Sequence, residues 1–163
     1  MRATMKSLIV GAVALMSLSA HAYEAQLASL NIRAFFHSGN LRSLRLVDGN
    51  VLRTGSILGS RFTWTVSAES NHLPSEVQRI QVQLRGQKSA SGTVMLSLFN
   101  YRSNTWETYG AITLPSARSG LSDVYILTNA SRFVGNTGTI QVRYSASGFC
   151  TLTTDRLMIA VNP

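Results

Sequence analysis

The most aromatic segment of the chain is LFNYRSNTWETY, which runs from Leu98 to Tyr109. Aromatic rings offer flat apolar faces to a sugar ring, while arginine and asparagine side chains donate hydrogen bonds to hydroxyl groups. This combination predicts a sugar-binding site in the segment. The candidate ligand-binding residues are Tyr101, Arg102, Asn104, Trp106 and Tyr109.

The same segment has a structural interpretation, and its spacing favours that interpretation. The run from Val94 to Leu98 alternates between apolar and other residues, as a half-buried strand does, and then breaks into a polar turn. Trp106 begins the next strand, where its ring would pack on Phe99 or Tyr101 and cover the end of a hairpin. We therefore expect the hairpin to hold two strands together, with ligand contact at its loop.

Period-two alternation dominates the rest of the chain. The runs RFTWTVS, RIQVQLR and TIQVRYS each place apolar residues on one face of a strand and polar residues on the other. Glycine, serine and asparagine turn signals separate these runs and several shorter strand candidates. The pattern predicts an all-β chain, and we prefer an antiparallel β-sandwich.

The first residues have the features of a secretory signal peptide. Arg2 and Lys6 precede an apolar run, and Ala20-His21-Ala22 resembles a cleavage site. We expect residues 1–22 to be removed and residues 23–163 to form a single β-sandwich domain in the secreted or periplasmic space. The apolar run is shorter than a membrane-spanning helix requires, and no later segment is apolar enough to span a bilayer.

The chain is basic and arginine-rich. Its formal net charge is +8 at neutral pH, which falls by two, to +6, when Arg2 and Lys6 leave with the leader. The arginines are spread along the strands and loops, and no compact basic run is present to bind nucleic acid specifically. A positive charge of this kind suits an acidic polysaccharide or lipopolysaccharide.

Few residues suit catalysis. Cys150 is the one cysteine, so a buried free thiol is expected and a disulfide to another chain is the alternative. His37 and His72 lie in no catalytic motif, and a nucleophile elbow is absent from the sequence. We expect no enzymatic activity. A small secreted hydrolase that uses two of the acidic residues is the catalytic alternative.

The order of several segments resembles the galactose-binding-like jelly-roll modules of secreted bacterial proteins. The matching features are Phe99-Asn100 before a short polar loop, Trp106 after it, and Asp155 ahead of the alternating residues Leu157, Ile159 and Val161. The resemblance covers about Ser38 to Val161. It implies a jelly-roll-like sandwich that binds glycans or other extracellular ligands.

The same resemblance implies a structural calcium ion held by an acidic residue near Asp155 and by backbone carbonyls. Asp48 could be a second ligand, because oxygen-rich turns suit a hard cation. A carboxylate within a strand is costly to bury unless it is paired. We therefore favour an ion pair between Asp155 and an arginine, or an exposed position, and expect no cofactor. Calcium bound at Asp48 and Asp155 is the alternative.

The sequence predicts a secreted or periplasmic, non-catalytic binding module for an extracellular or envelope glycan. Two other functions stay open. One is a structural or protein-interaction subunit of a surface assembly that binds through an exposed strand edge. The other is the small secreted hydrolase.

The single cysteine gives a first testable prediction. Because Cys150 has no partner cysteine in its own chain, a reducing agent should leave the melting temperature of the monomer unchanged. Thermal melts with and without dithiothreitol, together with thiol titration, measure this. A disulfide-linked dimer on a non-reducing gel would contradict the free-thiol prediction.

Overall fold

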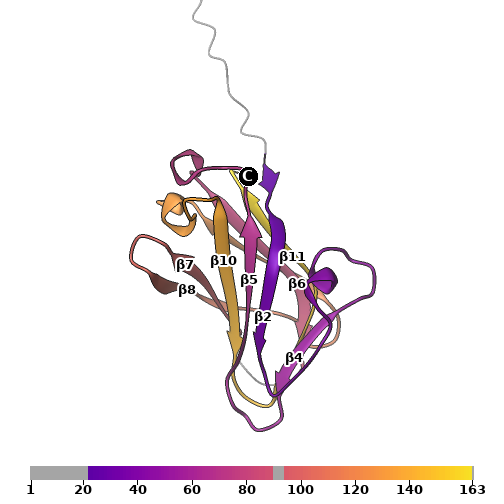
Figure 1. The fold of residues 1–163 in the computed structure, drawn as a ribbon. Helices are drawn as coiled ribbons and strands as arrows, with labels where there is room; N and C mark the ends of the chain where they lie inside the picture. The colour runs from indigo at the N-terminus through magenta and orange to yellow at the C-terminus, as the bar shows by residue number, and fades with distance from the viewer. Residues whose placement is uncertain (1–21, 90–93, 163) are drawn as a thin grey trace, which may run out of the picture.

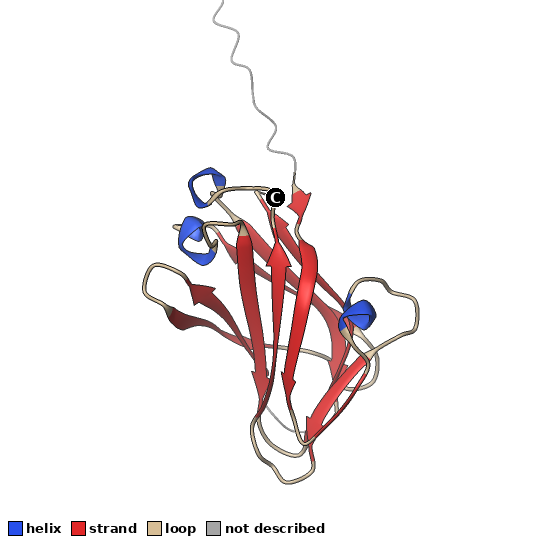
Figure 2. Ribbon diagram, in the orientation of Figure 1, coloured by secondary structure: helices blue, strands red, loops and turns tan. Residues whose placement is uncertain are grey.

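The structure is a computed structural model that describes residues 22–89 and 94–162. Two antiparallel β-sheets pack face to face, which confirms the predicted all-β sandwich (Figures 1 and 2). The predicted leader lies outside the described residues, except for Ala22.

Five strands of the six-stranded sheet have the order β3-β4-β11-β6-β9. The sixth strand, β1, pairs with the end of β11. The long final strand β11 lies at the centre of this sheet and pairs with both β4 and β6. Its strands are β1 (Tyr23–Glu24), β3 (Phe36–Ser38), β4 (Leu52–Ser56), β6 (Ile80–Lys88), β9 (Gly120–Ile126) and β11 (Cys150–Val161).

The five-stranded sheet has the order β2-β5-β10-β7-β8. Strand β10 lies in the middle, between β5 and β7. The strands are β2 (Gln26–Arg33), β5 (Phe62–Glu69), β7 (Val94–Asn100), β8 (Thr105–Ile112) and β10 (Thr139–Ala146).

Three short 3₁₀ helices lie in the connections of the part of the chain that the structure describes. They are η1 (Leu41–Leu44), η2 (Pro74–Glu76) and η3 (Ala130–Phe133). Within residues 22–89 and 94–162, no helix has the length and apolar character to cross a bilayer.

The core forms where the alternating apolar residues of both sheets meet. On β5, Phe62, Trp64 and Val66 are buried, while the residues between them are partly exposed. The rings of Trp64 and Tyr144 stack with centroids 4.5 Å apart, and the two residues are register partners on β5 and β10. This alternation buries the large side chains and turns the intervening polar ones to the outer face.

The strands run between two ends of the sandwich. The terminal end carries Tyr23 paired with Val161, together with the turn from Tyr101 to Asn104 (Figure 1). The opposite end, here called the distal end, is formed by the loops at residues 34–35, 57–61 and 147–149, together with the start of β3.

Gly138 lies in a closely packed turn at the terminal end, and Gly49, in an open loop, serves as its comparison. Gly138 has a φ of +80°, and a Cβ there would overlap the carbonyl oxygen of Ser70, whose amide donates to the carbonyl oxygen of Gly138. Gly49 has a similar φ of +85° but open space around it. We expect Gly49→Ala to lower the free energy of unfolding by about 1 kcal/mol, and Gly138→Ala to lower it by about 2 kcal/mol or more. Urea denaturation measures both, and equal losses would contradict the packing argument.

Candidate binding site on the outer face of the five-stranded sheet

The outer face of the five-stranded sheet contains a polar hollow of about 610 Å³. Strands β2, β5, β8 and β10 contribute to it, because each turns alternate residues away from the core. The residues that line it are Asn31, Arg33, Arg61, Thr63, Thr65, Trp106 and Arg143.

Trp106 and Arg143 form the most specific contact in this hollow. The Arg143 guanidinium carbon lies 4.3 Å from the centre of the Trp106 ring, so the planar cation covers one face of the indole. Trp106 also meets Phe99 edge-on, with ring centroids 5.3 Å apart. The predicted packing of Trp106 on Phe99 is therefore confirmed. These two contacts hold the indole and guanidinium planes in place.

The charge of the hollow is strongly positive. Arg33, Arg61 and Arg143 line it, and no aspartate or glutamate is among the residues that line it. Burial, followed by the charge of Arg61, lowers the pKa of Arg143 from its ordinary value. The Nε of Arg143 is buried and has no hydrogen-bond partner among the described residues. Arg61 donates to Ser145 Oγ at 3.1 Å, so a neutral group is its partner.

The hairpin turn holds three of the predicted site residues at the terminal end. The Tyr101 ring packs edge-on to Phe99 at 5.0 Å, and burial raises the pKa of the Tyr101 hydroxyl. Arg102 is exposed and donates to Ser131 Oγ at 3.1 Å. Asn104 has a φ of 55°, a left-handed conformation that asparagine tolerates in turns.

Tyr109 lies on the opposite face of β8 from Trp106. Its hydroxyl accepts a hydrogen bond from Arg132 at 3.1 Å, and its ring meets Phe133 edge-on. Arg132 also pairs with Glu107 at 3.0 Å. Hydrogen bonds from Arg132 and then from Asn100 lower the pKa of Glu107. This cluster ties η3 to β8, and it separates Tyr109 from the hollow that contains Trp106.

The two predicted calcium ligands have protein partners. Asp155 pairs with the Nε of Arg85 at 3.4 Å, which is the ion pair favoured from the sequence. Asp48 is exposed and accepts two hydrogen bonds from Asn50, which lower its pKa. In the described part of the chain, no three histidine, cysteine or acidic side chains gather where a metal would bind. Calcium at these positions stays a prediction.

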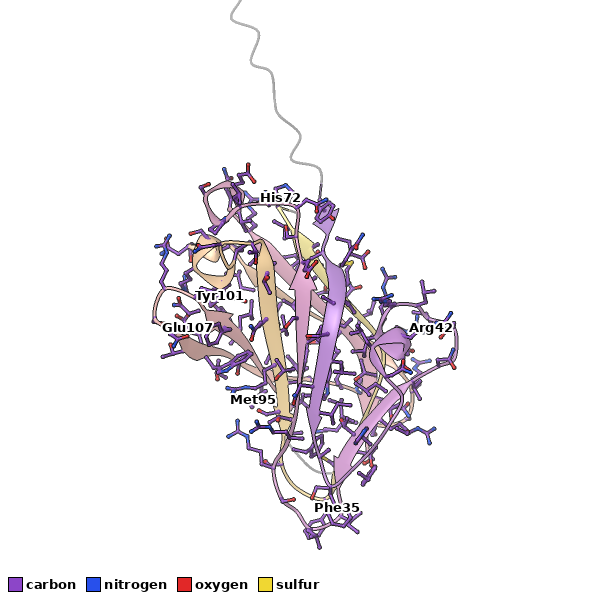
Figure 3. The ribbon with its side chains drawn as sticks, in the orientation of Figure 1. Phe35, Arg42, His72, Met95, Tyr101 and Glu107 are labelled. Atoms are coloured by element: carbon purple, nitrogen blue, oxygen red, sulfur yellow. The ribbon has the colours of Figure 1, made fainter. Side chains whose placement is uncertain are left out.

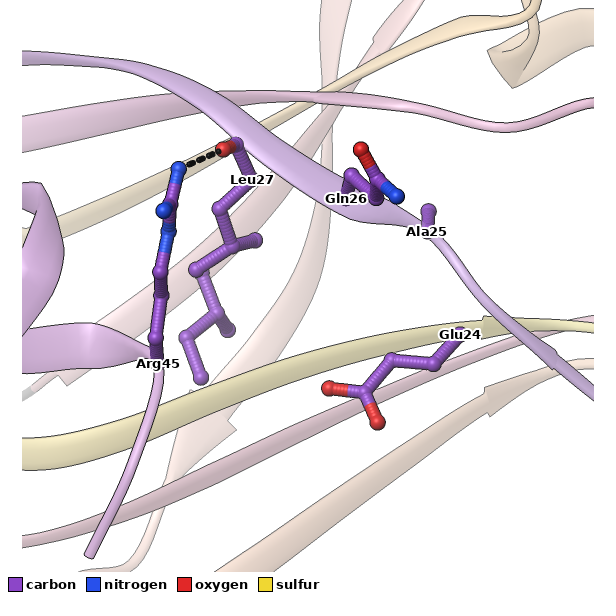
Figure 4. A pocket seen from close by; sticks show the side chains of 6 residues that line it. Glu24, Ala25, Gln26, Leu27 and Arg45 are labelled. Carbon is purple, nitrogen blue, oxygen red and sulfur yellow. Dashed lines mark hydrogen bonds between the residues drawn. The ribbon is translucent and has the colours of Figure 1, made fainter.

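A second hollow, of about 430 Å³, lies beside β2 (Figure 4). Arg45 points into it and donates to the carbonyl oxygen of Leu27 at 2.8 Å, while Glu24 pairs with Arg156 at 3.5 Å. Because its charged groups are engaged within the protein, this hollow is a weaker candidate than the arginine-lined face.

Sequence reasoning singled out Trp106 but missed the other residues of the hollow. From the sequence these arginines are only strand and loop positions spread along the chain, whereas in the structure Arg33 and Arg61 are exposed and Arg143 is half-buried against Trp106. The missing information is the register, because pairing of β10 with β7, and of β7 with β8, brings Arg143 beside Trp106. For Tyr109 a signal was present: strand residues three positions apart face opposite sides of a sheet.

Comparisons with known proteins identify the fold. No protein-family model matches the sequence, and a search of curated proteins finds no similar sequence. The CBM22-1 xylan-binding domain of Xyn10C from Paenibacillus barcinonensis aligns with a TM-score of 0.52 and 8% identity, over 86% of this chain and 92% of that domain. The xylan-binding module CBM15 aligns with a TM-score of 0.54 and 13% identity, over 86% of this chain and 95% of that module. At such identities the likeness shows the fold alone, and the fold is the galactose-binding-like jelly roll that the sequence resembles.

Proposed function

We propose that this chain is a non-catalytic glycan-binding module whose ligand lies across the outer face of the five-stranded sheet. The observation that carries this proposal is the hollow in which Trp106, polar strand residues and three arginines meet. Both structures compared above are described as xylan-binding, which supports a polysaccharide as the ligand class. An open face of this kind accommodates a long chain that enters and leaves at its edges.

The arginines favour an acidic polysaccharide over a neutral one. Each guanidinium presents several donors in a fixed plane that matches the two oxygens of a carboxylate. Arg33, Arg61 and Arg143 repel one another, and no acidic side chain among the residues that line the hollow compensates their charge. A uronate carboxylate or a sulfate would supply the missing negative charge.

The remaining groups suit the hydroxyls of the same sugar chain. Thr63 and Thr65 point outward from β5, and Asn31 lies opposite Thr65 on β2. Hydroxyl and amide groups both donate and accept hydrogen bonds, as sugar hydroxyls do. Trp106 orients the guanidinium plane of Arg143, and the Arg143 donors then contact the sugar chain. A leader-directed export to the periplasm or beyond would bring the site to an extracellular or envelope polysaccharide.

The central prediction concerns Arg143. Its replacement by alanine should weaken binding to polygalacturonate about tenfold or more, because a charge-assisted hydrogen bond contributes about 1.5–3 kcal/mol. Arg79→Ala is the control, since Arg79 is exposed and precedes β6 in the other sheet, and the net charge changes equally. Affinity gel electrophoresis and isothermal titration calorimetry measure the change. If polygalacturonate binds no better than neutral xylan, or if Arg79→Ala weakens binding equally, the acidic-ligand proposal fails.

A second pair of variants separates this face from the hairpin loop predicted from the sequence. Trp106 belongs to both candidate sites, whereas Arg102 belongs to the loop and Arg143 to the hollow. We expect Arg102→Ala to leave the affinity within about twofold of wild type and to leave the melting temperature unchanged, because exposed loop changes usually cost under about 0.5 kcal/mol. A larger loss of glycan affinity in Arg102→Ala than in Arg143→Ala would move the site to Tyr101, Arg102 and Asn104.

A further inference from the structure

The distal end of the sandwich exposes large apolar side chains on neighbouring loops. Phe35 and Phe36 are 55% and 36% exposed, Ile57 and Leu58 are 58% and 67% exposed, and Phe149 is 67% exposed. Figure 3 places Phe35 at the extreme end of the molecule, away from the chain terminus. Isolated exposed apolar residues are ordinary, but a contiguous group marks an interaction surface.

Three of these side chains are contiguous, and Phe35 and Leu58 are their neighbours in sequence. Phe36, Ile57 and Phe149 line one hollow of about 240 Å³. The ring of Phe149 lies against Gly59, where an added Cβ would be 3.1 Å from it, and the amide of Gly148 donates to the Gly59 carbonyl at 3.2 Å. The loops at 57–61 and 147–149 therefore support each other. We name Phe35, Phe36, Ile57, Leu58 and Phe149 the apolar tip.

The charges around the apolar tip are positive. Arg33 ends β2 just before Phe35, and Arg61 closes the loop that carries Ile57 and Leu58. The segments 33–38, 56–61 and 146–152 contain no aspartate or glutamate. A second copy of the chain fits this tip poorly, because a symmetric contact would bring its arginines against each other without an acidic partner.

We propose that the apolar tip docks on the surface of an anionic phospholipid bilayer. Exposed apolar side chains enter the boundary between headgroups and acyl chains, while nearby arginines contact the lipid phosphates. Basic residues close to an anionic surface contribute about 1 kcal/mol each. The strands run along the axis from this tip to the terminal end, so Trp106, which follows the turn at the terminal end, would lie away from the bilayer, whereas Arg33 and Arg61 of the hollow would lie close to it (Figure 1).

Co-sedimentation with vesicles tests the proposal on the chain that begins at Tyr23. We expect wild type to bind vesicles of phosphatidylcholine mixed with phosphatidylglycerol, and to bind phosphatidylcholine alone at least about tenfold more weakly. The double variant Leu58→Ser with Phe149→Ser should bind the mixed vesicles about tenfold or more weakly than wild type. Each substitution removes apolar surface that would otherwise be buried in the membrane interface. Both residues lie outside the arginine-lined hollow, so glycan affinity should be unchanged in this variant.

The matched control is Leu73→Ser with Leu127→Ser. These leucines are 54% and 62% exposed, on the connections that follow β5 and β9. The control should bind vesicles like wild type, and thermal melts should show both variants folded. The proposal is overturned if wild type ignores anionic vesicles, if the tip variant binds as well as wild type, or if the control loses binding equally. A dimer of wild type that the tip variant abolishes, without vesicle binding, would assign the tip to a second copy.

Discussion

The stack of Trp64 on Tyr144 fixes the register between β5 and β10. It joins the middle strand of the five-stranded sheet to one of its neighbours, and both side chains are fully buried in the core. A shift of one residue in either strand would move these rings to the solvent face. Because the register is held in this way, Thr63, Thr65 and Arg143 must face outward, as neighbours in sequence of the stacked pair.

Repulsion among arginines is the second constraint. The described ion pairs engage Arg85, Arg132 and Arg156, whereas the arginines of the hollow lie beside neutral groups, an aromatic ring and each other. Leaving like charges close together lowers stability unless something compensates them. The acidic polysaccharide that we propose as the ligand would supply the compensating negative charge on this open face. Contact with Trp106 orients the plane of the Arg143 guanidinium, which is planar by its own bonding.

Much of the fold was predictable because alternation is a local property. The runs around Trp64, Val82 and Val142 predict strands with one buried face, and the structure buries those residues. Phe99, Asn100 and Trp106 also support the jelly-roll resemblance, which the structural comparisons confirm at the level of the fold. Turn signals separate the strands well, since glycine at positive φ recurs between them.

The candidate site was less predictable because it depends on pairing between distant strands. Arg33, Arg61 and Arg143 belong to three separate parts of the sequence, and only the register brings them to one hollow. Tyr109 shows the opposite case, since its position on β8 turns it toward Arg132 and away from Trp106. In the apolar tip, Phe36, Ile57 and Phe149 likewise come together from segments that are distant in the sequence, and no local pattern predicts this.

Nuclear magnetic resonance titration with oligogalacturonate would detect an acidic glycan bound in the arginine-lined hollow. We expect the side-chain Nε–H of Arg143, the indole N–H of Trp106 and the backbone amides of Thr63 and Thr65 to shift together and to saturate at one ligand concentration. Neutral xylo-oligosaccharide should shift them less at equal concentration. Shifts confined to the turn from Tyr101 to Asn104, or no shifts on the outer face of the five-stranded sheet, would contradict the account.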